Sequence, residues 1–341
     1  MIRIITSEPN IRYFSGFSGS VALLIERDRS STLIVDGRYT IQARAEAYEG
    51  INVVQAPLHL SLLDAAVKIL KKEKVREIGY EDDRMTVESF NKLKAKFPGV
   101  KFRSISGELR GKRMVKNKKE IDLIRKAALI ADLTYDCMIR IIKAGMTELE
   151  ISAHIDYLIK TFKGDLPSFE TLVSSGKLSA HAHGKPSGKK VKKGDHLVMD
   201  FGAKYKGYNS DITRMASIGT PSKKVQRIYD AVLKAQLAAI AKVRAGAAAS
   251  AVDLAARDSL KKDKLDKYFD HATGHGVGLQ VHEGPRVSLT SRDILKEGMV
   301  ITIEPGVYIS GFGGFRVEDM VLVTKGGCEI LTKSPKELAV I

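Results

Sequence analysis

The chain has 341 residues, a hydrophobic content of 44%, and 56 Lys and Arg against 40 Asp and Glu, giving a net charge of +16. This length allows two domains with separate cores, and no apolar run reaches the roughly 18 residues of a membrane span. The first residues, MIRIITSEPN, lack a signal-peptide pattern, and Cys137 and Cys328 alone do not form a disulfide framework. We therefore expect a cytoplasmic protein without a membrane partner.

The excess of basic residues does not by itself indicate a nucleic-acid-binding protein. The lysines are distributed along the chain in short runs such as KKVKKGD and KKDKLDK, mostly among acidic residues and near turn signals. Such runs are typical of solvated helix faces and loop tips. Nucleic acid is therefore not an expected partner.

The amino-terminal part of the chain alternates short apolar runs with turn signals, which predicts strands and amphipathic helices. Strands are predicted over 3–6, 21–26, 31–36 and 51–56, and helices over 60–74 and 86–97. These elements predict a small α/β domain over residues 1–111. The following segment, GELRGKRMVKNKKE (107–120), is basic and interrupted by glycine, and predicts a link.

The second part of the chain, residues 112–341, opens with a long predicted helix from Lys119. Its apolar face holds Ile121, Ile124, Ala128, Ala131, Tyr135, Met138 and Ile142. Further helices are predicted over 148–162, 222–244 and 250–262, with capping boxes at Thr147–Glu150 and Ser250–Asp253. Strands are predicted over 196–203, 209–217, 298–309 and 315–324. Because helices and strands do not alternate strictly, the sequence predicts an α+β fold.

The stretch HATGHGVGLQVHEGP, residues 271–285, holds three of the eight histidines among several glycines. A helix would place His271 and His275 one turn apart, but each intervening glycine costs about 1 kcal/mol in a helix relative to Ala. A loop and a short strand are therefore predicted. Glycine there lets the backbone pass close to another group while side chains converge on it.

Carboxylates lie at or near the ends of the predicted strands. Asp200 ends one strand and Asp211 lies in the next, so a hairpin would bring them side by side, although an Asp near a glycine turn is often only a turn former. In VITIEPG, alternation places Thr302 and Glu304 on the face opposite the isoleucines. A buried unpaired acid at that position would be costly.

Glu318 adds a fourth carboxylate and is predicted to share one strand face with Arg316, where a structural ion pair is an equal alternative. Four converging negative charges repel one another unless cations neutralise them, and two divalent cations would supply that charge. Four carboxylates with His275 as the one nitrogen donor favour Mn, Co or Fe over a thiolate-type zinc site. Two metal ions sharing a water would generate a hydroxide nucleophile for hydrolysis.

Several sequence blocks together resemble the prolidase, aminopeptidase P and methionine aminopeptidase family. The blocks in the second part are MDFGAKYKGYNSDITR, HATGHGVGLQVHEGP, ITIEPGVYI and GFRVEDMVLV. In the first part, NIRYFSGFSGS and VDGRY resemble the amino-terminal domain of prolidases and aminopeptidases P. The resemblance implies a creatinase-like α/β domain over 1–111, followed by a pita-bread catalytic domain over 112–341.

The resemblance also implies a set of metal ligands. Asp200 would bind one metal ion, and Asp211 and Glu318 would bridge two. His275 and Glu304 would complete the ligand shells, with Glu304 also acting as the general base for the bridging water. The expected cofactors are two divalent ions, Mn²⁺ or Co²⁺, with Fe²⁺ or Zn²⁺ as alternatives.

Other residues are implied on the substrate side. His183 would line the substrate pocket, His282 would stabilise the tetrahedral intermediate, and His271 would lie beside the pocket for proline. Arg316 would lie near the metal centre, with Tyr308 in support. No catalytic role is expected for the remaining histidines, which are His59, His154, His181 and His196.

By the same resemblance, the chain is expected to be a metal-dependent exopeptidase that cleaves the Xaa-Pro bond of peptides with proline at the second position. Proline has no N–H, so this bond requires a dedicated pocket. Xaa-Pro dipeptidase is favoured because the first domain is compact, and aminopeptidase P, acting on longer peptides, is the alternative. Relatives imply a homodimer.

Three further alternatives fit less well. Methionine aminopeptidase normally lacks the first domain, and creatinase, a metal-free relative, would not keep all five ligands. Some non-catalytic relatives bind nucleic acid or proteins, but these typically lose metal ligands, which this chain retains.

Overall fold

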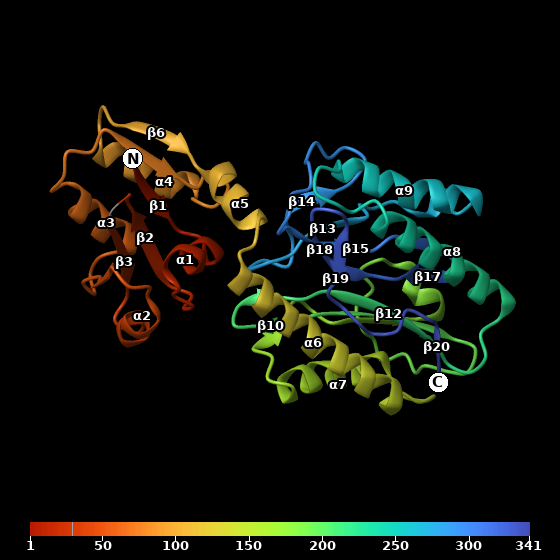
Figure 1. Cartoon of the computed structure of the whole chain (residues 1–341). Helices are drawn as coiled ribbons and strands as arrows, with labels where there is room; N and C mark the ends of the chain where they lie inside the picture. Colours follow the sequence, from red (N-terminus) through yellow and green to blue (C-terminus); the bar gives the residue numbers. More distant parts are fainter. Residues whose placement is uncertain (29) are drawn as a thin grey trace. The chain divides into compact units, whose positions relative to one another are not determined.

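The computed structural model describes residues 1–28 and 30–341, which form two compact units, Met1–Arg113 and Met114–Ile341 (Figure 1). Both units mix helices and strands, which confirms the α+β prediction. Within the described ranges, every helix is too short or too polar to span a membrane.

The first unit is built on one sheet with the strand order β4-β3-β2-β1-β5-β6. Its strands are β1 (Ile2–Ile5), β2 (Ala22–Glu26), β3 (Ser31–Val35), β4 (Ile51–Gln55), β5 (Glu77–Tyr80) and β6 (Lys101–Ser104). Its helices are α1 (Glu8–Ser15), α2 (Thr40–Glu46), α3 (Leu62–Leu70), α4 (Val87–Lys96) and α5 (Ser106–Met114). The predicted strands and the two predicted helices are confirmed, whereas α1 and α2 were not predicted.

Both faces of this sheet are covered. Alternate side chains of a strand point to opposite faces, so the neighbours Ile4 and Ile5 enter different cores. Ile4 packs with the residues of α3 and α4, and Ile5 packs with those of α1, α2 and α5. The unit therefore has three layers, with the sheet between two layers of helices.

The structure corrects the prediction for residues 107–120. Most of this segment, expected to be a link, belongs to the helix α5. Its two glycines make a helix unfavourable by about 1 kcal/mol each. Tertiary contacts outweigh that cost: Leu109 is fully buried in the core, and Glu108 pairs with Arg3 at 3.1 Å.

The second unit contains the longer helices and several smaller sheets. Its helices are α6 (Lys118–Ile141), α7 (Glu148–Thr161), α8 (Lys223–Ile240), α9 (Ala249–Lys262) and the 3₁₀ helices η1 (Gly176–Ala180) and η2 (Asp266–Tyr268). Its strands are β7 (Leu166–Pro167), β8 (Leu172–Ser175), β9 (His196–Phe201), β10 (Ala203–Tyr205), β11 (Tyr208–Asn209), β12 (Ile212–Ser217), β13 (Gly274–Gly276), β14 (Glu283–Val287), β15 (Val300–Ile303), β16 (Gly306–Ile309), β17 (Gly313–Arg316), β18 (Asp319–Val323), β19 (Cys328–Ile330) and β20 (Ala339–Val340).

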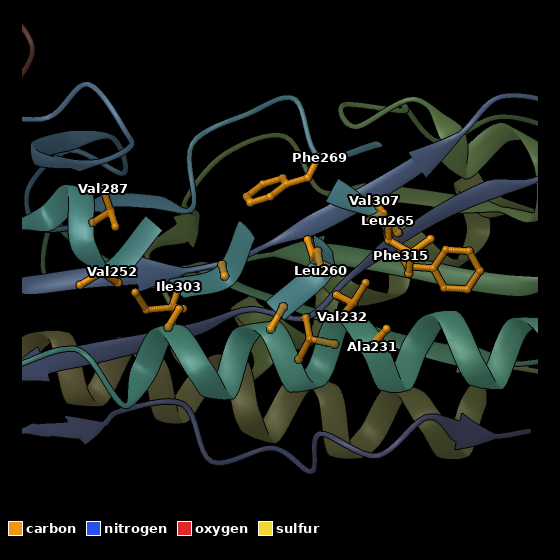
Figure 2. Packing of buried hydrophobic residues seen from close by; sticks show 14 of the residues in the cluster. Ala231, Val232, Val252, Leu260, Leu265, Phe269, Val287, Ile303, Val307 and Phe315 are labelled. Carbon is orange, nitrogen blue, oxygen red and sulfur yellow. The ribbon is translucent and has the colours of Figure 1, made fainter. Parts of the chain in front are cut away.

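Two of these sheets carry the main cores. In the sheet β20-β12-β9-β8, residues such as Met199 and Ile212 pack against α6 and α7. Residues of the sheet β14-β13-β15-β18-β19 pack against α8 and α9, as Figure 2 shows for Ile303 of β15 and Val232 of α8. The small sheets β11-β10-β7 and β16-β17 complete the unit.

The helix predictions for this unit are largely confirmed, with one wrong cap. Thr147 and Glu150 form the predicted capping box at the start of α7. The predicted box at Ser250–Asp253 is wrong, because α9 begins after Ala248 without a side-chain cap. The Asp253 carboxylate instead accepts the backbone N–H of Thr273 at 2.9 Å and pairs with a nearby arginine. Helix α8 ends at Ile240 rather than at residue 244.

Each long strand predicted in this unit is divided into two. The strand over 298–309 breaks at Glu304 and Pro305, between β15 and β16, where proline has no N–H to donate. The strand over 315–324 breaks at Val317 and Glu318, between β17 and β18. Arg316 and Glu318 are thus in different elements, but both contact the Thr213 hydroxyl and so lie on the same side, as predicted. The breaks place two carboxylates where the backbone leaves the sheet.

Candidate metal centre

The four carboxylates of the second unit lie at or beside the ends of two pairs of neighbouring strands. In the first pair, β9 and β12 run antiparallel with Asp200 opposite Thr213, and Asp211 directly precedes β12. In the second, β15 and β18 run antiparallel, with Glu304 directly after β15 and Glu318 directly before β18. The predicted hairpin between the first two strands is confirmed.

The side chains of Asp211, His275 and Glu318 form the tightest group, with one donor atom of each within 4.8 Å of the others. His275 Nε2 lies 3.6 Å from Asp211 Oδ2 and 3.3 Å from Glu304 Oε1. Asp200 does not belong to this tight group and accepts a hydrogen bond from the guanidinium of Arg316. The structure thus brings three predicted ligands together, with Glu304 beside His275.

The glycines around His275 have a steric reason. His275 lies in β13, so the predicted short strand is confirmed. A Cβ atom on Gly274 would lie 2.0 Å from the carbonyl oxygen of Thr302, and one on Gly276 would lie 2.0 Å from that of Gly284. Only glycine permits this close approach of β13 to its neighbours, which places the imidazole among the carboxylates.

The electrostatics of the carboxylates favour a cation. Burial and the negative charge of Glu318 raise the pKa of Asp211 well above its ordinary value. Burial and the charge of Glu304 do the same to the pKa of Glu318. Asp200 Oδ1 and Glu318 Oε1 are buried without a hydrogen-bond partner. Buried acceptors of this kind are costly unless a cation or donor satisfies them, so the donor set fits divalent metal ions.

His275 presents one nitrogen to the carboxylates. Its Nδ1 lies 3.1 Å from the carbonyl oxygen of Gly276, which can only accept, so Nδ1 carries a proton and Nε2 faces Glu304. Although burial alone would raise the pKa of Glu304, its hydrogen bond and attraction to His275 lower that pKa to about 2. The hydroxyl of Thr302 also donates to Glu304 at 3.1 Å, which confirms that the two share a face.

A chain of hydrogen bonds leads from Asp200 to His271. Arg316 donates to Asp200 and also to the hydroxyl of Tyr308 at 2.6 Å. The Tyr308 hydroxyl lies 3.1 Å from Nε2 of His271, whose Nδ1 donates to the carbonyl of Ala272. Both ring nitrogens of His271 are therefore occupied within the protein, and burial lowers the pKa of this imidazole.

Two further histidines lie on the exposed side of the centre. The ring of His282 is 4.3 Å from that of His275, centroid to centroid. His183 is exposed and lies in the segment after η1. Burial raises the pKa of Asp200, and the nearby Arg316 and His183 offset part of that rise. His196, expected to have no catalytic role, is buried in β9 against Phe315, and burial lowers its pKa to about 4.

Residues that the sequence did not single out support the ligands. Thr213 donates to Glu318 Oε2 at 2.7 Å and accepts from Arg316 Nε at 3.0 Å. Its position in β12, two residues after Asp211, was the available signal, because alternate residues share a strand face.

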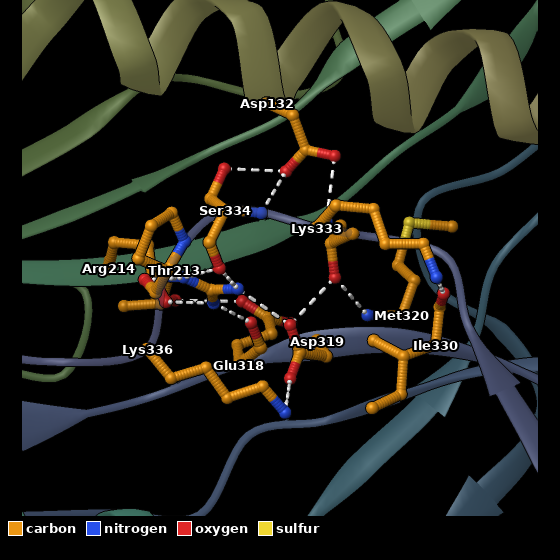
Figure 3. A network of polar contacts seen from close by, with 12 residues as sticks. Asp132, Thr213, Arg214, Glu318, Asp319, Met320, Ile330, Lys333, Ser334 and Lys336 are labelled. Carbon is orange, nitrogen blue, oxygen red and sulfur yellow. Dashed lines mark hydrogen bonds and ion pairs between the residues drawn. The ribbon is translucent and has the colours of Figure 1, made fainter.

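A second polar network lies behind Glu318 (Figure 3). The buried guanidinium of Arg214 donates to the backbone carbonyls of Thr213 and Glu318, and it pairs with Asp319 at 2.7 Å. Asp319 accepts further bonds from Thr332, Gln236 and Lys336. The network therefore fixes the backbone on either side of the carboxylates.

Comparisons with known proteins identify the family of the chain. Residues 122–325 match the model of metallopeptidase family M24, and residues 2–115 match the creatinase/prolidase N-terminal domain. The chain is 38% identical to an Xaa-Pro dipeptidase of Pyrococcus furiosus, over 98% of this chain and 94% of that one.

Solved structures give the same result. An Xaa-Pro dipeptidase from Bacillus anthracis superposes with a TM-score of 0.95 at 36% identity, covering 100% of this chain and 95% of that one. An X-Pro aminopeptidase from Thermotoga maritima gives a TM-score of 0.93 at 36% identity, with coverages of 100% and 97%. The chain belongs to metallopeptidase family M24, with a creatinase/prolidase-type amino-terminal domain.

Proposed function

We propose that this protein is a metal-dependent Xaa-Pro dipeptidase. The observation that carries the proposal is the group of buried carboxylates around His275, in which Asp200 and Glu318 each keep a buried oxygen without a donor. The similarity to Xaa-Pro dipeptidases over nearly the whole chain gives the substrate class.

Two divalent ions would be held by Asp200, Asp211, His275, Glu304 and Glu318. Oxygen donors with a single imidazole favour Mn²⁺ or Co²⁺, with Fe²⁺ or Zn²⁺ as alternatives. When bound, two such ions lower the pKa of a shared water so that it can attack a peptide carbonyl near neutral pH.

The protein side chains would then divide the remaining tasks. Glu304, whose carboxylate lies beside His275 in the group of proposed ligands, would accept the proton of the attacking water. His282 would donate to the oxygen on which negative charge develops. Arg316 holds Asp200 in place and fixes the Tyr308 hydroxyl, which in turn orients His271.

The substrate would enter from the side of His183 and His282, both of which are exposed. Because the nitrogens of His271 are occupied, we propose that its ring contributes a wall beside the proline pocket rather than a hydrogen bond to the substrate. The Xaa-Pro bond has no N–H, so recognition has to come from shape and from contacts to the carbonyl.

Aminopeptidase P activity is the second candidate, because the X-Pro aminopeptidase of Thermotoga maritima is as similar in sequence as the dipeptidase from Bacillus anthracis. The deciding experiment strips the metal with a chelator, restores Mn²⁺ or Co²⁺, and compares an Xaa-Pro dipeptide with an Xaa-Pro-Xaa tripeptide. Metal-dependent cleavage of the dipeptide alone is expected. Cleavage of the tripeptide would reassign the protein to aminopeptidase P, and cleavage of neither would refute the proposal.

We also propose that the protein is a homodimer, as the resemblance to prolidases implies. Light scattering of the metal-loaded protein should give twice the chain mass of 37.4 kDa. A monomer mass would contradict this assignment without affecting the metal site.

A further inference from the structure

A buried carboxylate outside the metal centre connects two distant points of the chain. Glu148, the first residue of α7, has 0% exposure. Its Oε1 accepts the backbone N–H of Ser175 at 2.8 Å and the Ser175 hydroxyl at 2.7 Å. Its Oε2 accepts the backbone N–H of Ser187 at 3.2 Å and the Ser187 hydroxyl at 2.6 Å. Each oxygen thus holds one residue by two bonds.

Ser175 and Ser187 border the segment 176–186, which contains η1 and His183. Inside the segment, the carbonyl of Ala182 accepts from Arg316 Nη1 at 3.1 Å, and the Ser179 hydroxyl accepts from the N–H of Gly314 at 2.9 Å. The segment is therefore attached to β17 near its middle and to Glu148 at both ends.

Backbone hydrogen bonds from the start of α7 also hold the chain at and after Ser187. The backbone N–H groups of Glu148 and Leu149 donate to the carbonyls of Lys189 and Ser187, each at 3.1 Å. Burying a carboxylate is costly unless several donors surround it, and charge-assisted hydrogen bonds are about twice as strong as neutral ones. Glu148 is thus a strong attachment for the segment that carries His183.

We propose that Glu148 is a positioning residue that holds both ends of the segment 176–186 and thereby sets the position of His183 beside the metal centre. The proposal rests on the substrate role proposed above for His183. Glu148 acts through the segment, because its side-chain hydrogen bonds go to Ser175 and Ser187 and not to a proposed metal ligand.

The test uses the full-length, Mn²⁺-loaded protein and the variant Glu148→Gln. An amide replaces one acceptor oxygen by a donor, which would face the backbone N–H of one serine and remove the charge-assisted attachment at that end of the segment. Because one charge-assisted attachment is lost, KM for the Xaa-Pro dipeptide should rise about tenfold with little change in kcat. The affinity for Mn²⁺, measured by calorimetry, should stay the same.

Glu150→Gln is the matched control. Glu150 lies on the same first turn of α7, but it is exposed and caps the helix through Thr147 alone. The variant Glu150→Gln weakens the start of α7 but leaves the hydrogen bonds to Ser175 and Ser187 in place. Its KM should therefore stay at the wild-type value. An equal rise of KM in both variants would assign the effect to helix stability and overturn the proposal.

A double-mutant cycle with His183→Ala separates positioning from general destabilisation. If Glu148 acts through His183, then Glu148→Gln should raise KM no further in the His183→Ala background. The same tenfold factor in both backgrounds would contradict the proposal. If Glu148→Gln does not fold, Ser187→Ala removes one attachment at one end and should give a smaller change in the same direction.

Hydrogen exchange makes the result independent of the proposed reaction. The amides of residues 176–185 should exchange faster in Glu148→Gln than in wild type and Glu150→Gln. If wild type cleaves neither peptide, the proposed function fails and this readout alone decides the role of Glu148. Unchanged exchange in this segment would overturn the proposal even if the protein is an active dipeptidase.

Discussion

Glu318 and Asp319 are adjacent, both buried, and differ in how their charge is balanced. Asp319 pairs with Arg214 and Lys336, as Figure 3 shows. It also accepts bonds from Thr332 and Gln236, so both of its oxygens have donors. Glu318 has only the Thr213 hydroxyl on one oxygen, and its other oxygen is buried without a donor.

The difference separates a structural carboxylate from a ligand. The charge of Asp319 is matched by two cationic side chains, and this satisfied network fixes the backbone from behind. Glu318 interacts with three other carboxylates, and the guanidinium of Arg316 beside it is bonded to Asp200. The fold thus keeps unmatched negative charge on one side of the strand, where metal ions would neutralise it.

The largest effect is expected at the metal centre, where the negative charge of the carboxylates is not fully balanced. Asp211→Asn should abolish metal binding and hydrolysis together, because Asp211 is proposed to bridge both ions. Elemental analysis of the purified protein and the rate of Xaa-Pro hydrolysis test this. A variant that keeps full activity would remove Asp211 from the ligand set.

In the network where Arg214 and Lys336 balance the charge of Asp319, Asp319→Asn should lower the free energy of unfolding rather than the metal affinity. Removing this charge leaves Arg214 buried and unpaired, which costs about 3–5 kcal/mol. Denaturant unfolding should show a similar loss with and without Mn²⁺. A loss seen only in the metal-loaded protein would mean that Asp319 acts mainly through the ligands.

His282→Ala should leave the carboxylates of the metal centre and the network around Asp319 intact. It should lower the rate of the reaction alone. Loss of one donor to the developing negative charge costs on the order of 10²–10³ in kcat. Metal content should equal that of wild type. Reduced metal content would instead make His282 a ligand, consistent with its closeness to His275.

The smallest effect concerns pH. The raised pKa values of Asp211 and Glu318 mean that the metal-free folded protein holds protons that the unfolded chain releases at its ordinary values of 3.8 and 4.5. Raising the pH above those values therefore destabilises the metal-free protein until both groups have ionised. Bound cations remove this penalty and compete with the protons, so the stabilisation by metal should increase with pH.

Thermal unfolding with and without Mn²⁺ between about pH 5 and pH 8 measures this stabilisation. The difference in Tm should widen as the pH rises. A difference that is constant or narrows would contradict the charge imbalance inferred for Glu318.

The sequence predicted the elements that depend on residues close together in the chain. The long helix α6 follows from its apolar spacing, and the capping box of α7 from Thr147 and Glu150. Thr302 and Glu304 follow from strand alternation. In the first unit, the bounds of the four predicted strands were close for the same reason.

The remaining features depend on contacts between distant residues. The start of α1 is fixed by the carboxylate of Glu81, which accepts from Ser7 at 2.9 Å, and α5 forms because Leu109 reaches the core. Asp253 matched a capping pattern but binds Thr273 instead. In the site, the charged residues were visible in the sequence, whereas the pairing of Arg214 with Asp319 and the attachment by Glu148 appear only after folding.

The most direct test of the central claim is calorimetric titration of the metal-free protein with Mn²⁺ near neutral pH, with Glu318→Gln beside wild type. Wild type should bind two ions per chain and release protons, because the pKa values of Asp211 and Glu318 are raised without metal and bound cations displace those protons. Glu318→Gln should lose at least one ion. No binding by wild type, or equal binding by both proteins, would contradict a dinuclear metal centre at these carboxylates.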